Sequence, residues 1–168
     1  AAYLPCYNVD VHGREEYAPR YMRAFASKYV HALKSARERK RAIIICGDLQ
    51  VAMTHMDQTA NAIEGGSGST DTEREALKEL FGDNRYTDLY RELHPEGQET
   101  TSTASHKQWT GLSNGRERVG KRIDYILGSS EIEALAYHID QTPLTDHITD
   151  HAAVIATVRY HPARQACI

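Results

Sequence analysis

The sequence predicts a single α/β domain in which strands alternate with helices. Two observations support this class. Apolar segments of strand length lie at 42–48 and 153–160, and a long segment with apolar residues at helical spacing precedes the first of them. The chain has 168 residues, which is enough for one domain with a substantial core. It shows no internal repeat and no linker, so we expect one domain over residues 1–168.

The first part of the chain predicts a strand, a long helix and a second strand. The opening strand runs into a proline-marked turn at Tyr3-Leu4-Pro5, and a native domain rarely starts inside a core strand. We therefore expect either a processed chain or a longer protein whose front precedes this sequence. A helix is expected from Glu15 to Arg39, because apolar residues recur there at steps of three and four. The run from Ala42 to Asp48 is continuously apolar, as in a buried strand.

The second part of the chain predicts shorter elements. A glycine–serine run at 65–69 indicates a flexible loop tip, and Thr70 or Asp71 can cap a helix that runs to Phe81. Residues 87–93 and 99–104 are interpreted as a short helix and a strand. A strand at 121–127, a helical turn at 131–136, and strands at 137–141 and 153–160 complete the expected order.

The charge distribution gives no global attraction to nucleic acid, because the net charge is −3. Two local basic clusters lie at Arg37–Arg41 and Arg116–Arg122. The first is interpreted as a solvated helix C-terminus, where positive charge suits the helix dipole. The second lies beside a strand that carries a carboxylate, and both nucleic-acid contact and plain solvation remain open for it.

The cysteines indicate a reduced compartment, and we expect an intracellular protein. Cys6, Cys46 and Cys167 are widely spaced without a CxxC pair, so they imply neither a disulfide framework nor a zinc site. Cys46 is expected to pack as a small hydrophobe within its strand. No apolar run approaches the roughly 20 residues that cross a bilayer, and no signal peptide is visible, so no membrane partner is expected.

Three short strings carry the functional prediction: Gly47-Asp48-Leu49-Gln50, Arg122-Ile123-Asp124-Tyr125, and Thr149-Asp150-His151. Each lies where an apolar, largely β-branched run begins or ends. Each therefore places an acid at the edge of a sheet where a strand starts or stops. Each string alone is weak, because Gly-Asp and Asp-His pairs are common in turns. Together they predict three acids and a histidine that bind a divalent cation and cut a phosphodiester.

The strings resemble those of the endonuclease/exonuclease/phosphatase superfamily, and within it the exonuclease III-type apurinic endonucleases and the endonuclease domains of non-LTR retrotransposons. The resemblance rests on six matches in fixed order, at residues 3–5, 16–21, 47–52, 88–95, 120–125 and 149–154, with Asp57 and Thr100-Thr101 at the expected distances. It implies part of a four-layered α/β sandwich, in which two packed mixed β-sheets are flanked by helices. This chain would be the C-terminal two-thirds of such a domain.

The resemblance also implies roles for the site residues. Asp48 helps to place the attacking water, and Gln50 stands where the family has an asparagine that holds that water and the phosphate. Asp124 orients His151, which hydrogen-bonds the scissile phosphate. Asp150 belongs to the metal shell, for Mg²⁺ or alternatively Mn²⁺.

For two of the predicted site residues, Tyr3 and His151, the sequence leaves an alternative open. Tyr3 donates its hydroxyl to the phosphate or acts in proton transfer, but a plain core role remains open for it, since it is one of ten tyrosines. His147 competes with His151, because Thr145-Asp146-His147 repeats the same string. We prefer His151, since the family's Asp-His pair leads directly into the final strand.

Several departures from the family leave more than one function open. Gln50 replaces the asparagine, Lys121 stands where many apurinic endonucleases have tryptophan, and the family's N-terminal half carries a glutamate metal ligand that these residues do not supply. The first hypothesis is a Mg²⁺-dependent phosphodiesterase acting on DNA, as a repair or retroelement endonuclease. The alternative is a catalytically degenerate member that serves as a structural or binding subunit among other proteins. A relative acting on lipid or sugar phosphates is a third.

Overall fold

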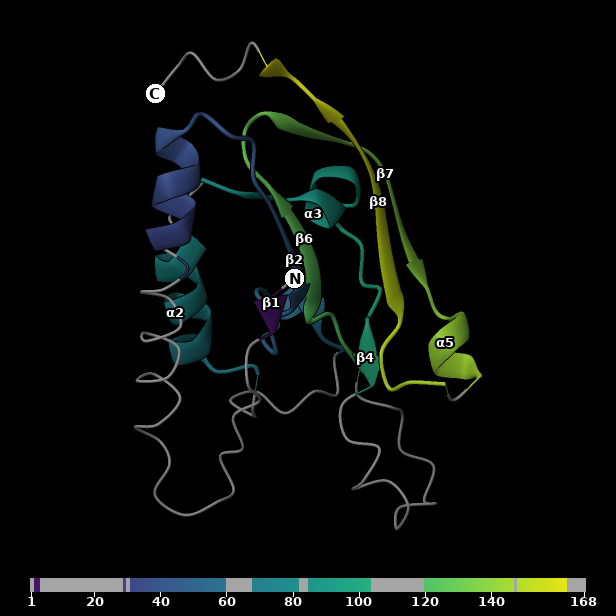
Figure 1. Cartoon of the computed structure of the whole chain (residues 1–168). Helices are drawn as coiled ribbons and strands as arrows, with labels where there is room; N and C mark the ends of the chain where they lie inside the picture. The colour runs from purple at the N-terminus through teal and green to yellow at the C-terminus, as the bar shows by residue number, and fades with distance from the viewer. Residues whose placement is uncertain are drawn as a thin grey trace, which may run out of the picture.

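The computed structural model describes residues 2–3, 29, 31–59, 68–81, 85–103, 120–146 and 148–162, with only the backbone at residues 2, 3, 80, 81, 103 and 144. It is a mixed α/β structure, as predicted. A four-stranded sheet has the order β1-β2-β6-β3, and two small two-stranded sheets pair β4 with β5 and β7 with β8. Figure 1 shows the helical segment 31–38 and α2 on one side of the four-stranded sheet and the β7–β8 hairpin on the other.

The four-stranded sheet is mixed, and its register places the predicted acids. β1 (Ala2–Tyr3) runs parallel to β2 (Ile44–Asp48), and β2 pairs antiparallel with β6 (Asp124–Gly128). β3 (Thr87–Asp88) adds to the other edge of β6. Tyr3 lies opposite Asp48 in the first pairing, and Asp48 lies opposite Asp124 in the second. The predicted acids of two separate strings therefore meet at one end of the sheet.

The core lies between this sheet and the helices. Ile45, Leu49, Tyr125 and Leu127 pack with Leu77 of α2 (Asp71–Phe81) and with residues of the 31–38 helix. The predicted helix 15–39 is thus present at 31–38, and most of the rest lies outside the described residues.

The expectation that β2 is buried on both faces was wrong. Its side chains alternate, with Ile45 buried while Ile44 and Cys46 on the other face are exposed. Cys46 is therefore a free, exposed cysteine and not a packed hydrophobe. Side chains alternate across a strand, so a run of apolar residues does not itself decide how many faces are covered.

A long hairpin forms the second sheet. β7 (Ile132–Asp140) pairs antiparallel with β8 (Ala153–Tyr160) along nearly its whole length, with a bulge between Ala134 and Ala136. The helical turn predicted at 131–136 was therefore wrong. The helix preference of Glu133-Ala134-Leu135-Ala136 is overridden by pairing with β8 and by packing of Ile132 and Ala134 against Leu89.

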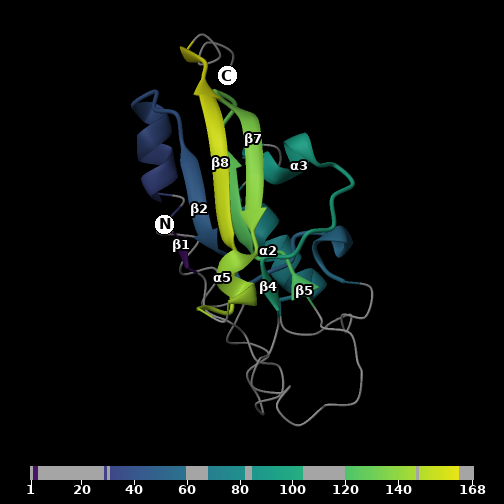
Figure 2. The ribbon, with the colours of Figure 1, turned by 90° about the vertical axis from the view of Figure 1, so that its right-hand side faces the viewer.

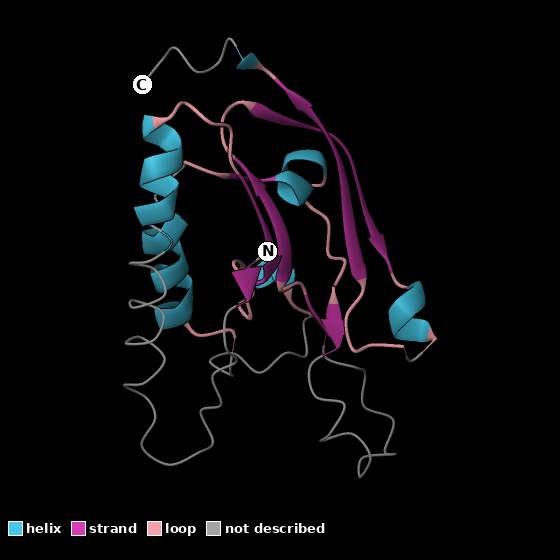
Figure 3. Ribbon diagram, viewed as in Figure 1, coloured by secondary structure: helices cyan, strands magenta, loops and turns pink. Residues whose placement is uncertain are grey.

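The remaining elements of the described structure are short. α3 (Leu89–Leu93) begins at its N-cap Asp88, and α5 (Thr142–Thr145) follows β7. β4 (Ser102–Thr103) pairs with β5 (Gly120–Lys121), so the strand predicted at 121–127 is divided between two sheets. The short helix η1 (His55–Asp57) follows the turn after β2. Figure 3 shows these helices beside the strands.

The start of α2 confirms one of the two predicted caps. The Thr70 hydroxyl accepts from the Glu73 amide at 3.2 Å, and the Thr70 amide donates to the Glu73 carboxylate at 2.9 Å, which is a capping box. The preceding glycine–serine run is not a loop tip at its end, because Gly68 and Ser69 are buried. Among the described residues no helix is long and apolar enough to span a membrane.

Candidate active site

Asp48 and Asp124 form the sheet-borne part of the candidate site. Asp48 is the last residue of β2, Asp124 is the first of β6, and the two are paired residues in the antiparallel register. Directly paired residues point to the same face of a sheet, so the two carboxylates project together. The pairing continues past the strand end, where the Leu49 amide donates to the Ile123 carbonyl at 2.8 Å.

His151 is the third member of the group, and it comes from the segment just before β8. Its Nδ1 lies 2.8 Å from Asp124 Oδ2, and its Nε2 lies 3.9 Å from Asp48 Oδ2. The predicted hydrogen bond between Asp124 and His151 is confirmed, and so is the predicted convergence of Asp48, Asp124 and His151. The catalytic roles assigned to these residues remain predictions.

The segment carrying His151 is held by Thr101, which the sequence reasoning did not single out for a role. The buried Thr101 hydroxyl accepts from the Ile123 amide at 3.0 Å and from the Asp124 amide at 3.1 Å. Its carbonyl accepts from the Ala152 amide at 2.7 Å, and Ser102 forms a β-bridge with His151. Thr101 therefore lies between strand β6, which carries Asp124, and the segment before β8, which carries His151. A threonine among several in a strand gives no periodic signal that would have found it.

Burial and like charge shape the electrostatics of the group. Burial raises the pKa of Asp48, and the nearby Asp124 charge raises it further, while hydrogen bonds from Gln50 and the His151 charge act against this. The hydrogen bond to Asp124 raises the pKa of the His151 imidazole, with help from the charges of Asp124, Asp48 and Asp150 and against its partial burial. Asp48 is thus more basic than an ordinary aspartate, and His151 keeps its proton to a higher pH than an ordinary histidine.

Gln50 closes a tight turn onto Asp48. Its backbone has φ 58°, in the left-handed region, and its amide N donates to Asp48 Oδ1 at 2.8 Å. The side-chain Nε2 of Gln50 also donates to Asp48 Oδ2. Gly68 (φ 73°) packs so closely on the Gln50 carbonyl that a Cβ there would lie 2.4 Å from the oxygen. The structure therefore places Gln50 in contact with Asp48, with its amide already bonded.

The other predicted site residues are less closely tied to the group. Tyr3 has its backbone opposite Asp48, but its side chain is outside the described residues. Asp150 is exposed and close to the Thr149 hydroxyl at 3.4 Å, and it is not part of the converging group formed by the described residues. Its role as a metal ligand stays a prediction. His147 and Trp109 lie outside the described residues.

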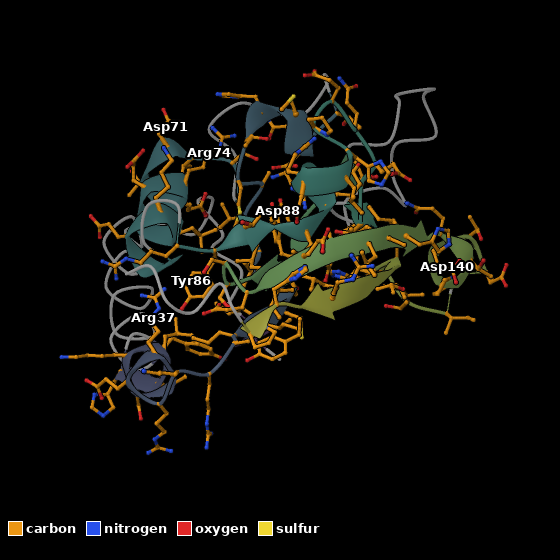
Figure 4. The ribbon with its side chains drawn as sticks, turned by 90° about the horizontal axis from the view of Figure 1, so that it is seen from above. Arg37, Asp71, Arg74, Tyr86, Asp88 and Asp140 are labelled. Atoms are coloured by element: carbon orange, nitrogen blue, oxygen red, sulfur yellow. The ribbon has the colours of Figure 1, made fainter. Side chains whose placement is uncertain are left out.

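Of the two basic clusters, the second has described residues beside the site, since Lys121 pairs with Ser102, which bridges His151. Arg122, from the second cluster, is fully buried and paired with Asp57 and Asp88, so it is not available to nucleic acid. The first cluster precedes β2, whereas Asp48 ends it, so the two occupy opposite ends of the sheet (Figure 1). Arg37 lies with its guanidinium 4.9 Å from the Tyr86 ring centre, and Figure 4 shows the pair at the helical side of the molecule.

A divalent cation fits the donor set of the group. Asp48, Asp124 and His151 each offer one ligand atom, and these atoms lie within 4.8 Å of one another. Carboxylate oxygens are the ligands that Mg²⁺ and Mn²⁺ prefer, and Mg²⁺ is commonly held by one or two carboxylates together with water and substrate phosphate. Burial is the main reason that the Asp48 pKa is raised, and repulsion from Asp124 adds to it; a bound cation would offset this repulsion.

Comparison with known proteins gives partial matches to DNA repair nucleases. The chain is 32% identical over 95 residues to the DNA repair nuclease APEX1 of Danio rerio, covering 55% of this chain and 29% of that protein. It is 29% identical over 121 residues to an exodeoxyribonuclease of Bacillus subtilis, covering 70% and 44%. A DNA-(apurinic or apyrimidinic site) endonuclease of Dictyostelium discoideum is 35% identical over 94 residues, covering 55% and 24%. The chain thus spans less than half the length of these curated relatives. No family model matches it.

Solved structures show the same fold over most of this chain. An AP endonuclease from Archaeoglobus fulgidus matches with a TM-score of 0.66 at 18% identity, covering 90% of this chain and 56% of that one. The 3′ phosphatase NExo from Neisseria, solved with a product DNA hairpin, matches with a TM-score of 0.67 at 21% identity, covering 89% and 56%. Fold and site define a mixed α/β protein with an acid–histidine group at a sheet edge. The chain is a distant homologue of the apurinic endonucleases and exonuclease III, of the endonuclease/exonuclease/phosphatase superfamily, over part of their length.

Proposed function

We propose that this chain is part of a divalent-metal-dependent phosphodiesterase that acts on DNA. One observation carries the proposal: His151 is bonded to Asp124 at 2.8 Å through Nδ1, while its Nε2 faces Asp48 Oδ2 at 3.9 Å. A carboxylate–histidine pair facing a second, more basic carboxylate is an arrangement suited to moving protons at a phosphate. The matched relatives, which are named as DNA nucleases, support DNA as the substrate class.

The residues take complementary parts in this proposal. Asp124 accepts a hydrogen bond from the Nδ1–H of His151 and so fixes the orientation of the ring. His151, which keeps its proton to a raised pH, donates from Nε2 to a phosphate oxygen. Asp48 helps to place the attacking water, which a cation held beside it would make more acidic. The roles of Tyr3, at the phosphate, and of Asp150, in the metal shell, belong to the proposal on the strength of the family resemblance.

The metal is proposed to bind at the carboxylates. A bound Mg²⁺ or Mn²⁺ would neutralise the charge that develops on the phosphate and the leaving oxygen. Asp48 and Asp124 would hold it, with Asp150 as an outer contributor. His151 engages Asp124 through Nδ1 and keeps Nε2 for the phosphate.

The proposal also includes the way in which the sheets pack against each other. We infer that the four-stranded sheet and the β7–β8 hairpin belong to the two packed sheets of a four-layered α/β sandwich. Figure 2 supports this, because β8 lies in front of the strands of the other sheet. The matched structures support it too, since this chain covers 56% of each of two of them. Other segments or subunits would complete the domain around the site.

A degenerate binding subunit is the second candidate, and Gln50 is the observation that favours it. The Gln50 amide is bonded to the Asp48 carboxylate, so it is engaged and not presented to a water or a phosphate. In this alternative the fold and the Asp124–His151 pair persist as structure, and the chain contributes surface to a larger complex.

The test is cleavage of duplex and abasic-site DNA by the protein that carries this sequence. We expect cleavage that requires Mg²⁺ and falls by roughly 10²–10⁴-fold in His151→Ala, because a positioned proton donor is removed. His138→Ala is the matched control, since His138 is exposed on β7 away from the group, and it should cleave as the parent does. Cleavage that survives in His151→Ala would contradict the site. Absence of cleavage in the parent protein would favour the binding subunit.

A further inference from the structure

We propose that the buried guanidinium of Arg122 is the positioning group of this site. It fixes the start of β6 against the loop after β2, and so holds Asp124 opposite Asp48 and against His151. The sequence placed Arg122 in a basic cluster, but the structure buries it completely. The inference rests on the proposed role of Asp48, Asp124 and His151 as one site. It goes beyond that role because it names Arg122 as the residue that holds the three side chains in position.

Arg122 is bound by two carboxylates from two other segments. Its Nε donates to Asp57 Oδ1 at 2.8 Å, and its two terminal nitrogens donate to the two oxygens of Asp88 at 3.2 and 2.5 Å. Asp57 is the last residue of η1, which follows the turn after β2, and Asp88 is the N-cap of α3. Figure 4 shows Asp88 near the centre of the molecule, beside the strands. The guanidinium therefore joins three parts of the chain at one point.

Arg122, Asp57 and Asp88 form a cluster that a second arginine and two aromatic rings complete. Arg91 also donates to Asp57 Oδ1, and it binds the Gly97 carbonyl at 2.5 Å, so the two charges of each sign are matched. The Arg122 guanidinium lies 4.7 Å from the Tyr90 ring centre and 4.4 Å from that of Tyr125. A planar guanidinium with one forked and one single carboxylate contact and two ring contacts has little freedom to move.

The cluster reaches the site through the backbone of residues 122–125. The Arg122 amide donates to the Asp57 carbonyl at 2.7 Å, on one side of Asp124. On the other side, the Tyr125 hydroxyl accepts from the Met53 amide at 2.9 Å and lies 2.7 Å from the Arg122 carbonyl. Asp124 is thus flanked by two residues that are both tied to the loop after β2.

Tyr137 lies beside the cluster, with its ring centre 5.4 Å from that of Tyr90. Its buried hydroxyl has no hydrogen-bond partner within the described residues. Burial raises its pKa, and the charges of Asp88 and Asp124 raise it further while that of Arg122 lowers it. The cluster therefore also contacts β7, which carries Tyr137.

Arg122→Lys is the variant that separates positioning from charge. Lysine keeps one positive charge in the same place but cannot form the fork to Asp57 and Asp88. Arg159→Lys is the matched control, because Arg159 is an exposed arginine with a single pairing to Glu133 at 3.3 Å. Asp88→Asn is the second variant if Arg122→Lys does not fold, since it weakens one arm of the fork and leaves Asp57 in place.

Two readouts are needed, and neither depends on catalysis. The first is the proton NMR signal of the His151 Nδ1–H that is bonded to Asp124, recorded on protein whose amide spectrum shows that it is folded. The second is Mn²⁺ binding, measured from the electron paramagnetic resonance of free Mn²⁺. We expect the folded Arg122→Lys protein to lose or shift the Nδ1–H signal and to bind Mn²⁺ about 10–100-fold more weakly. Arg159→Lys should change neither.

A purely structural role for Arg122 would give a different result. Folded Arg122→Lys or Asp88→Asn protein that unfolds at lower denaturant, yet keeps the Nδ1–H signal and the Mn²⁺ affinity of the parent, would overturn the proposal. If the parent shows the Nδ1–H signal but binds no Mn²⁺, the proposed metal function fails while the positioning proposal is still decided by NMR.

Discussion

Gln50 is the residue whose chemistry distinguishes the two functional proposals most sharply. Its side-chain amide bonds the same Asp48 oxygen that faces His151. An asparagine at this position is one methylene shorter, and asparagine tolerates a left-handed backbone such as the φ of 58° found here better than most residues. The exchange therefore changes the reach of the amide without adding backbone strain.

We predict that Gln50→Asn leaves Mg²⁺-dependent cleavage equal to that of the parent protein or raises it. The reason is that the shorter amide releases the Asp48 oxygen and restores the residue type of the related nucleases. Cleavage rates at saturating and limiting DNA would measure this, with Gln98→Asn at an exposed position as the control. A loss of about tenfold or more would show that the glutamine itself is needed in the reaction.

The raised pKa of His151 leads to a second prediction, which concerns how the stability of the protein depends on pH. Its pKa in the folded protein is raised above 6.5, first by the hydrogen bond to Asp124. The stabilisation from this bond is therefore fully present below the unfolded pKa and is lost as the pH rises through the folded pKa. The raised pKa of Asp48 acts in the same direction at lower pH, because its ionisation is disfavoured in the folded state.

We predict that, as the pH rises above about 6.5, the free energy of unfolding falls more steeply in the parent than in His151→Gln, because glutamine cannot titrate. Urea unfolding at several pH values, with a chelator present to exclude bound cations, would measure the two slopes. Equal slopes would mean that the Asp124–His151 bond contributes no pH-dependent stability.

At the scale of elements, Thr101 joins the strand that carries Asp124 to the segment that carries His151. Its hydroxyl accepts two backbone amides, those of Ile123 and Asp124. Valine has nearly the same shape but no acceptor, so Thr101→Val leaves these amides without their partner. We predict a loss of stability of about 1–3 kcal/mol, the usual consequence of a buried unsatisfied donor.

Chemical denaturation of Thr101→Val and of Thr157→Val would measure this effect. Thr157 is exposed on β8, so the same substitution there should change the free energy of unfolding little. Equal, small changes in both variants would mean that the Thr101 hydroxyl does not support the site.

The elements also show what the sequence could and could not predict. Strand β8 was predicted with its observed ends, because its apolar residues are β-branched and sustained. The first half of β7 was interpreted as a helix, because Glu133 to Ala136 favour helices locally and only pairing with β8 makes them a strand. The strand predicted at 121–127 divides at Arg122, because β5 and β6 join different partners.

At the scale of the whole molecule, the candidate site depends on contacts between segments far apart in the sequence. Asp48, Asp124 and His151 were predicted, because acids at strand ends carry a local signal. The buried cluster of Asp57, Asp88, Arg91 and Arg122 was not, because its charges pair only in three dimensions. A basic run in the sequence indicates charge but not whether the chain buries it against acids from elsewhere.

The central claim is that Asp48 and Asp124, facing His151, hold one divalent cation, and Mn²⁺ binding to the protein tests it most directly. Electron paramagnetic resonance of free Mn²⁺ would be followed in a titration of the parent, of Asp48→Asn and of Asp146→Asn. Asp146 is an exposed aspartate outside the converging group, so its variant is the matched control. We predict that the parent and Asp146→Asn bind one Mn²⁺ that Mg²⁺ displaces, and that Asp48→Asn binds it at least about tenfold more weakly. Equal binding by the parent and Asp48→Asn, or no binding by the parent, would contradict the claim.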